Sequence, residues 1–131
     1  LDQDGQHSSF FSSCVQAADY IESRGFSKEQ INIGFPFYGT WEGGRMEQYA
    51  YNAISEEISP FNNFYTMKKS DTKEDRYTYF NSQAIIRDKT AYAYLKGYGG
   101  VMIFSQYCDL PSDDERSLTK AISDYLQEVT K

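Results

Sequence analysis

The stretch INIGFPFYG, residues 31–39, decides the fold that this chain of 131 residues is expected to adopt. Ile31, Ile33 and Phe35 are β-branched or aromatic, and such side chains favour an extended, largely buried backbone. The glycines and the proline among them restrict the run to a few residues. The sequence therefore predicts a short buried strand that ends at a loop.

An amphipathic helix is expected just before this strand, over residues 9–24. Its apolar residues recur at spacings of three and four, which is typical of one buried helical face: Phe10, Cys14, Ala17, Ala18 and Ile21. Gly25 follows as a helix C-cap, because glycine adopts a positive φ without a Cβ clash. Ser82 begins a second helix, which ends at Gly97.

A second strand is expected in GGVMIFS, residues 99–105, a few residues after that helix. A nearly all-apolar strand after a short helix-to-strand connection favours a parallel sheet that is covered on both faces. Ser112 and Glu115 have the spacing of a capping box, whose side chains accept hydrogen bonds from backbone N–H groups at a helix start. They predict a last helix over residues 113–129.

The order helix, strand, long loop, helix, strand and helix is typical of the α/β class with parallel strands. Residues 40–81 are expected to be irregular, apart from a short strand near residues 76–80, so that residues 41–81 form a long loop or insertion. Two parallel strands cannot cover both of their faces or close their edges. The predicted sheet is therefore incomplete, and something else must complete it.

The composition excludes several classes of partner. The chain has 13 basic and 19 acidic residues, a net charge of −6, and no basic cluster, so binding to nucleic acid is not expected. No apolar run approaches the ~18 residues that a membrane-spanning helix needs. With one His and two Cys, neither a metal site nor a cofactor is expected. Cys14 and Cys108 are interpreted as reduced thiols, with a single disulfide between them as the alternative.

Aromatic residues are numerous, with 12 Tyr, 9 Phe and 1 Trp. Such residues fill hydrophobic cores, but Tyr and Trp also present flat apolar faces with a polar group, on which sugar rings stack. Composition alone leaves both interpretations open.

Two segments resemble one protein family. INIGFPFYG, with the turn at residues 25–29 before it, resembles the seventh barrel strand of family 18 glycoside hydrolases, where a G-x-P-x-Y-G run occurs. Residues 82–105 resemble the family's last helix and strand through Ser82, Lys89, Tyr92, Gly97, Gly99, Gly100, Val101 and Met102. The resemblance covers the whole chain, residues 1–131. It implies a partial TIM (β/α)₈ barrel, made of the C-terminal βα units with parallel strands.

Enzymes of this family cleave β-linked N-acetylglucosamine glycans, such as chitin, N-glycan cores or peptidoglycan. They use substrate assistance and one protonated Glu, which closes a D-x-x-D-x-D-x-E motif. That motif does not occur in this sequence, and the acidic runs at 112–115 and 55–57 are interpreted as a helix start and a solvated loop. The resemblance thus implies a chain that supplies a substrate-binding wall and no catalytic residue. The rest of the barrel would come from a missing N-terminal segment or another chain, and the family favours a secreted or cell-surface location.

The resemblance also implies substrate-binding residues, because barrel sites form at the carboxyl ends of the strands. Tyr38 matches a family Tyr near the −1 sugar, and Phe104 aligns with the Trp that forms the floor of that subsite. Trp41 and Gln106 are expected on loops at the rim. Core packing is the alternative for Tyr38, filling of a degenerate pocket for Phe104, and packing on the rim for Trp41. Thr40 stands where the family often has Arg, which removes a charged contact.

Tyr79, Phe80 and Asn81 occupy the place of a Tyr-Asp-Asp run that chitinases commonly have before the helix. Asn81 and Ser82 are interpreted as helix-capping residues, not as part of the chemistry.

Three functions are compatible with these observations. The first is a glycosidase of family 18 type, and the second is a catalytically inactive, lectin-like member of the same fold, which Phe104 and Thr40 favour. The third is an independent α/β interaction module without a sugar ligand, which would fold alone as a monomer. The Glu of the D-x-x-D-x-D-x-E motif, upstream of Leu1, distinguishes the first two.

Overall fold

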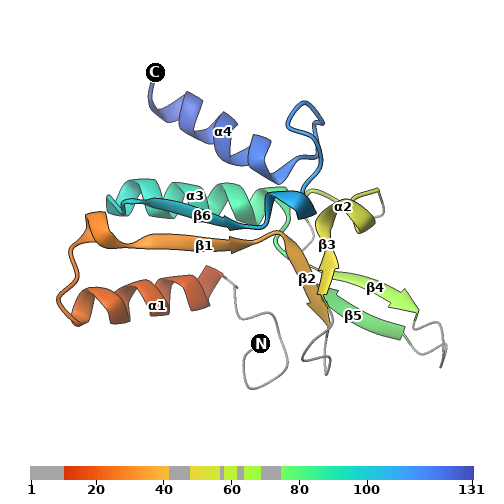
Figure 1. The fold of residues 1–131 in the computed structure, drawn as a ribbon, viewed down its shortest axis with the longest axis horizontal. Coiled ribbons are helices and arrows are strands. Elements are labelled where there is room, and N and C mark those ends of the chain that lie inside the picture. Colours follow the sequence, from red (N-terminus) through yellow and green to blue (C-terminus); the bar gives the residue numbers. More distant parts are fainter. Residues whose placement is uncertain (1–10, 42–47, 57, 62–63, 69–74) are drawn as a thin grey trace.

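A computed structural model of the chain describes residues 11–41, 48–56, 58–61, 64–68 and 75–131. Helices pack beside a parallel sheet of two strands, and an antiparallel sheet of four strands extends from one end of it (Figure 1). The side chains at 40–41, 48–49, 64–68 and 75–77 are outside the description.

The parallel sheet contains the two strands that the sequence predicts. β1 (Asn32–Pro36) pairs in parallel with β6 (Gly100–Phe104), and each residue of β1 faces one of β6, from Asn32 opposite Gly100 to Pro36 opposite Phe104. The expected parallel pairing is confirmed. Gly99 precedes β6, and a Cβ at this position would lie 2.1 Å from the carbonyl oxygen of Glu29, so only glycine fits there.

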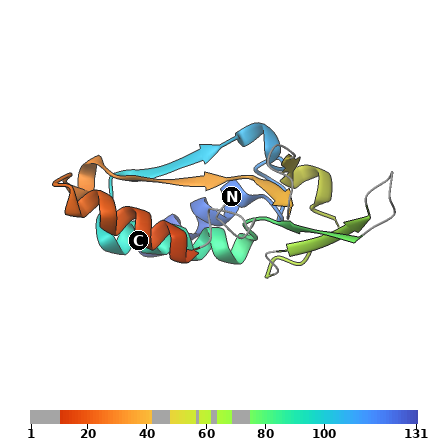
Figure 2. The ribbon, with the colours of Figure 1, turned by 90° about the horizontal axis from the view of Figure 1, so that it is seen from below.

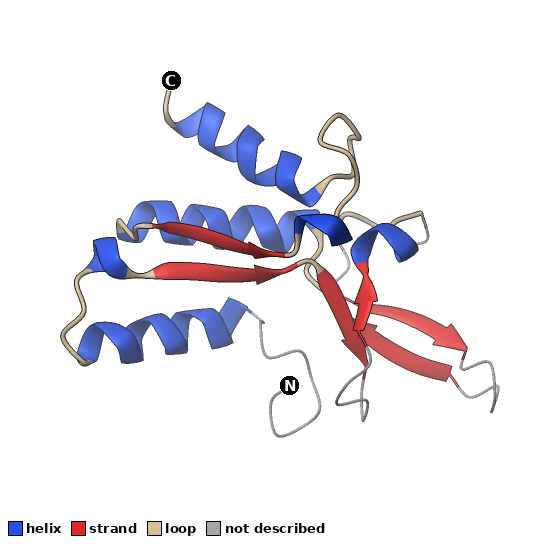
Figure 3. Ribbon diagram, viewed as in Figure 1, coloured by secondary structure: helices blue, strands red, loops and turns tan. Residues whose placement is uncertain are grey.

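Two of the three long helices lie beside this sheet, and the third packs on one of these two. α1 (Phe11–Ser23), α3 (Gln83–Lys96) and α4 (Leu118–Val129) are seen with the two strands in Figure 3, and Figure 2 shows helices on one side of the strands. Apolar residues of the sheet and the helices form one hydrophobic core, which contains Ala18, Ile33, Phe35, Ile86, Ala93, Leu118 and Ile122. The predicted helices around residues 9–24 and 82–96 are therefore confirmed.

The predicted helix ends are largely correct. Ser82 is the N-cap of α3, and its hydroxyl oxygen accepts a hydrogen bond from the backbone N–H of Ile85. Gly97 ends the same helix with a φ of 76°, and Gly25 follows α1 with a φ of 94°. Both glycines thus adopt the left-handed conformation that other residues avoid.

The predicted start of the last helix is wrong. α4 begins at Leu118, with Ser117 as its N-cap, and Ser112 and Glu115 lie in the turns before it. The reason is a long-range acceptor, because the carboxylate of Asp109 accepts hydrogen bonds from the backbone N–H groups of Leu118 and Thr119, both at 2.8 Å. A helix that started at residue 113 would leave this buried carboxylate without these donors.

The expectation of an irregular segment at residues 40–81 is also wrong. The described parts form an antiparallel sheet in the order β3-β2-β5-β4, which joins β2 (Tyr38–Trp41), β3 (Gln48–Ala50), β4 (Phe64–Lys68) and β5 (Asp75–Tyr79). A short helix, α2 (Tyr51–Ile54), follows β3. The predicted strand near residues 76–80 corresponds to β5, which pairs with the preceding strand β4 and with β2, a partner far away in sequence that no local pattern indicates.

The parallel sheet is covered on one face only by the described residues. Ile33 and Phe35 are buried against the helices, whereas Met102 and Phe104 on the opposite face are 52% and 59% exposed. This differs from the expected cover on both faces, and it agrees with the expected incomplete sheet. β1 pairs with β6 along one edge, and no other described strand lies along its second edge.

Cys14 and Cys108 are partly exposed and are not joined in a disulfide. In the parts of the chain that the structure describes, no helix has the length and apolarity to cross a membrane. Those parts also contain no cluster of three or more His, Cys, Asp or Glu side chains that could bind a metal ion.

Candidate functional site

Two aromatic side chains meet where the parallel strands end. Phe104 is the last residue of β6, and Tyr38 is the first residue of β2, just after the end of β1. Their ring centroids are 6.3 Å apart at an interplanar angle of 89°, an edge-to-face contact. This geometry is favourable for aromatic rings, and it leaves ring faces available for other contacts.

The backbone holds the two residues together. The N–H of Phe37 donates a 2.9 Å hydrogen bond to the carbonyl oxygen of Phe104, and the N–H of Tyr51 donates to the carbonyl of Phe37 at 3.1 Å. The Phe104–Ser105 peptide bond is cis. The position of the aromatic pair therefore depends on β1, β6 and α2.

A cavity of about 420 Å³ begins at this pair and continues between β1 and α1. At the carboxyl ends of the strands, Tyr38, Phe104 and Pro36 line it, and at the other end Ile21 and Ile31 line it. Most of the other lining residues are small or apolar, namely Ser13, Cys14, Ala17, Ala18, Asn32, Ile33, Gly34, Phe35 and Met102. No Asp, Glu or His occurs among these described lining residues. Their chemistry suits the stacking of a flat ligand with few polar contacts.

The structure brings together two of the four residues that the sequence suggests for substrate binding, Tyr38 and Phe104. Gln106 lies two residues beyond Phe104 in a short 3₁₀ helix (Gln106–Cys108), where it is exposed and does not line the cavity. The backbone of Trp41 pairs with Thr78 in the antiparallel sheet, but its side chain lies outside the described residues. Trp41 and Gln106 therefore stay predictions.

Asn81 does not act as a helix cap, in contrast to its sequence interpretation. Its side-chain Nδ2 donates a hydrogen bond to the carbonyl oxygen of Pro36 at 3.2 Å, and its Oδ1 accepts one from Nζ of Lys89. Ser82 provides the cap alone. Asn81 thus connects the end of β1 to helix α3.

Lys89 has a role that the sequence analysis missed, although its position was noted as a match. It is fully buried, and burial lowers its pKa to about 8, an effect that a hydrogen bond with Cys14 partly opposes. The sequence contained a sign of this burial, since Lys89 has helical spacing with the buried residues Ile86 and Ala93. A Lys on the apolar face of a helix needs a polar partner inside the protein.

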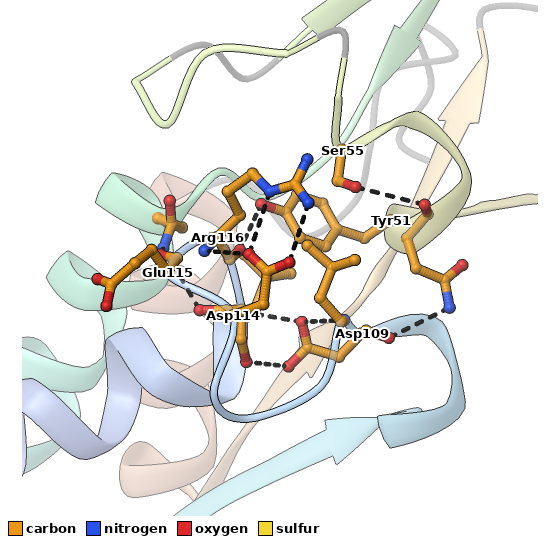
Figure 4. Close-up of polar contacts among 11 residues, drawn as sticks. Tyr51, Ser55, Asp109, Asp114, Glu115 and Arg116 are labelled. Carbon is orange, nitrogen blue, oxygen red and sulfur yellow. Dashed lines mark hydrogen bonds and ion pairs between the residues drawn. The ribbon is translucent and has the colours of Figure 1, made fainter.

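The loop after β6 is fixed by a second set of polar contacts. The side-chain Nδ2 of Asn52, on α2, donates hydrogen bonds to the carbonyl oxygens of Tyr107 at 3.0 Å and Asp109 at 3.1 Å. The hydroxyl of Tyr51 donates to the carbonyl of Arg116 at 2.7 Å. Burial and the charge of Asp109 raise the pKa of Tyr51 to about 12, so it stays neutral and donates. Figure 4 shows Tyr51 with the polar residues around it, including Asp109 and Arg116.

Asp109 has a structural role in this loop. Its carboxylate accepts hydrogen bonds from the hydroxyl of Ser117 and from the backbone N–H groups of Leu110, Leu118 and Thr119. Asp114 pairs with the guanidinium of Arg116, which holds the pKa of that carboxyl below its usual range (Figure 4). With its lone pairs already engaged, the Asp109 carboxylate is better explained as a helix cap than as an acid or base.

Comparison with known proteins gives the chain a family and a fold. A family model described as Glycosyl hydrolases family 18 matches residues 2–109. Among solved structures, the GH18 chitinase ChiB from the chitin utilization locus of Flavobacterium johnsoniae has a TM-score of 0.72 and 22% identity, over 98% of this chain and 38% of that chain. A chitinase from Bacteroides thetaiotaomicron has a TM-score of 0.73 and 24% identity, over 98% of this chain and 42% of that chain.

A third structure, YKL-39 in the presence of chitooligosaccharides, has a TM-score of 0.65 and 16% identity, over 86% of this chain and 39% of that chain. None of the curated proteins matches the chain. At these identities the structures show a shared fold. The expected partial barrel is confirmed, and the chain spans about two fifths of the length of these solved structures.

Proposed function

Because this chain belongs to glycosyl hydrolase family 18, we propose that it forms a substrate-binding wall for β-linked N-acetylglucosamine glycans in a glycosidase barrel. Chitin, N-glycan cores and peptidoglycan all contain this sugar. The observation that carries the proposal is the Tyr38–Phe104 pair, which lines the cavity at the carboxyl ends of both parallel strands. Barrel enzymes bind their substrates at these strand ends.

The chemistry of the pair supports a sugar ligand. Phe104 is 59% exposed and offers an apolar ring to the C–H groups of a pyranose, while the half-buried Tyr38 adds a hydroxyl for hydrogen bonding. YKL-39 has been solved with chitooligosaccharides on the same fold. We include Trp41 and Gln106 as further contacts at the rim, because both follow the strand ends that carry the pair.

The proposal assigns the catalytic acid to a part of the barrel outside this chain. The cavity lining contains no carboxyl group among the described residues, so protonation of a glycosidic oxygen needs a group from elsewhere. A missing N-terminal segment or another chain would supply that group. It would also supply the strand that lies along the free edge of β1, where Ile21 and Ile31 line the far end of the cavity.

The second candidate is a glycan-binding protein without catalysis. It is favoured by the same lining without acidic groups, and by Phe104, which offers a smaller ring than Trp and no N–H donor. The two candidates share the binding wall and differ only in the acid. Assaying hydrolysis of a chromogenic N-acetylglucosamine dimer by the complete barrel distinguishes them.

Thermal unfolding with and without N-acetylglucosamine tetramer tests the binding wall. A ligand that binds only the native state raises the unfolding midpoint, and at a hundred times Kd it stabilises by about 2.7 kcal/mol. A glucose tetramer, which lacks the acetamido groups, is the control and is expected to give a smaller shift. If neither sugar moves the midpoint, the proposed binding wall is wrong, and the interaction-module hypothesis gains support.

A further inference from the structure

One peptide group at the end of β1 is held on both sides. This group joins Pro36 to Phe37, where the chain leaves the parallel sheet and enters the antiparallel one. Its carbonyl oxygen, from Pro36, accepts a 3.2 Å hydrogen bond from Nδ2 of Asn81. Its N–H, from Phe37, donates a 2.9 Å hydrogen bond to the carbonyl oxygen of Phe104. The two bonds fix the plane of this peptide group.

The plane of this group sets the relative position of the aromatic pair. Tyr38 is the next residue along the chain, and Phe104 is the residue that the group binds on its other side. If the plane rotated, the N–H would turn away from Phe104, and the edge-to-face contact with Tyr38 would change. Hydrogen bonds at both ends of one peptide group also polarise each other and become stronger.

The orientation of the Asn81 side chain is itself determined by a neighbour. Asn81 is 3% exposed and Lys89 is 0% exposed, so neither contact is open to exchange with water at a free surface. An ammonium group only donates hydrogen bonds, so the oxygen of the Asn81 amide must face Nζ of Lys89. The amide nitrogen then faces the carbonyl of Pro36. Lys89 thus selects the amide orientation that holds the peptide group.

We propose that Asn81 is a positioning residue for the sugar-binding pair Tyr38 and Phe104, with Lys89 fixing the orientation of its amide. This inference rests on the proposed function, in which the pair contacts the glycan. Asn81 does not line the cavity, and it acts through the Pro36–Phe37 peptide group. A glycan that stacks on one ring and bonds to the other depends on their separation and angle.

Asn81→Asp is the most direct test. An ionised carboxylate has nearly the same shape and still accepts from Lys89, but it cannot donate to the carbonyl of Pro36. Asn52→Asp is the matched control, because it also removes side-chain donation to backbone carbonyls, but on the loop after β6. Both variants are compared with the wild-type chain in amide hydrogen exchange of Phe37 and in Kd for N-acetylglucosamine tetramer, at a temperature where all are folded.

We expect Asn81→Asp to accelerate exchange at Phe37 and weaken sugar binding by about fivefold each, the effect of one neutral hydrogen bond. Asn52→Asp should leave the Phe37 exchange rate unchanged. The inference is overturned if Phe37 exchange does not change, if it changes equally in both variants, or if Kd stays constant while exchange accelerates. Should the wild-type chain bind no sugar, the proposed function fails, and the exchange comparison alone decides whether Asn81 holds the pair.

Discussion

Lys89 donates a hydrogen bond to the side-chain oxygen of Asn81, and no part of Lys89 is exposed to solvent. The partner is a neutral amide, which stabilises an ammonium group less than a carboxylate does. Burial therefore dominates and lowers the pKa of Lys89 to about 8, against the opposing effect of Cys14. This buried amine makes the stability of the protein depend on pH in a range where few other groups titrate.

We predict that the free energy of unfolding rises between pH 8 and pH 10. In this range Lys89 is neutral in the folded protein but protonated in the unfolded chain, whose pKa is 10.5, so the unfolded state binds more protons. The full difference of about 3 kcal/mol is reached only above pH 10.5, and about 2 kcal/mol of it develops between pH 7 and pH 9.5. Urea unfolding at pH 7, 8, 9 and 9.5 measures it.

Lys89→Met is the control for this rise, because it keeps an apolar side chain of similar length and has no proton to lose. The variant should lose the increase between pH 8 and 9.5. Measurements stop below pH 10 because the raised pKa values of Tyr51 and Tyr98 lower stability at higher pH. A wild-type protein whose stability is flat or falls over this range contradicts the assignment to Lys89.

Asp109→Ala should destabilise the protein by about 2–3 kcal/mol, because it removes a helix cap and leaves buried donors unpaired. The donors are the Ser117 hydroxyl and the N–H groups at the start of α4. Asp113→Ala is the matched control, since Asp113 is exposed on the same loop and should change stability by less than about 0.5 kcal/mol. Equal losses in the two variants in urea unfolding would argue against the capping role of Asp109.

Gly99→Ala should cost about 3 kcal/mol, because the new Cβ meets the backbone oxygen of Glu29, which cannot move without shifting the chain before β1. Gly97→Ala places its Cβ in open space and strains only a backbone with a φ of 76°, at about 1 kcal/mol. The difference between the urea midpoints of the two variants measures how much of the stability loss in Gly99→Ala comes from the steric clash with Glu29. If Gly97→Ala is the more damaging change, the close approach of Gly99 to Glu29 is not real.

Tyr38→Ala and Phe104→Ala should each weaken binding of N-acetylglucosamine tetramer about tenfold, equal to about 1.4 kcal/mol. Phe104→Trp should strengthen it, because the indole offers a larger face and an N–H donor. Phe61→Ala is the control, since Phe61 is 78% exposed and does not line the cavity. Isothermal titration calorimetry gives the Kd values of these four variants and of the wild-type chain. If Phe61→Ala weakens the binding of the tetramer as much as Tyr38→Ala does, the sugar does not bind at the Tyr38–Phe104 pair.

The sequence predicted those helices and strands that are determined by the pattern of neighbouring residues. The stretch at residues 31–39 gave β1, and the spacing of Ile86, Ala93 and their neighbours gave α3. The same stretch did not reveal that the chain changes sheets after Pro36. That change depends on pairing of Tyr38 with Ala50 and of Thr40 with Tyr79, which are distant in sequence.

The candidate site was predicted in part for the same reason. Tyr38 and Phe104 could be placed together because each ends a predicted parallel strand, and such ends meet at one edge of a sheet. The start of α4 could not be placed, since the Asp109 carboxylate binds the Ser117 N-cap and the first N–H groups of the helix from a distant part of the sequence. The link from Lys89 through Asn81 to Pro36 joins three separate segments, so no single motif contains it.

In the proposed function, the Tyr38–Phe104 pair contacts an N-acetylglucosamine glycan. A titration of the chain with the tetramer, followed by NMR of the aromatic ring resonances, tests it most directly. We predict that the ring signals of Tyr38 and Phe104 shift together with one saturation curve, while those of Phe61 do not move. Shifts at Phe61 without shifts at Tyr38 and Phe104, or no shifts at any ring, would contradict the claim.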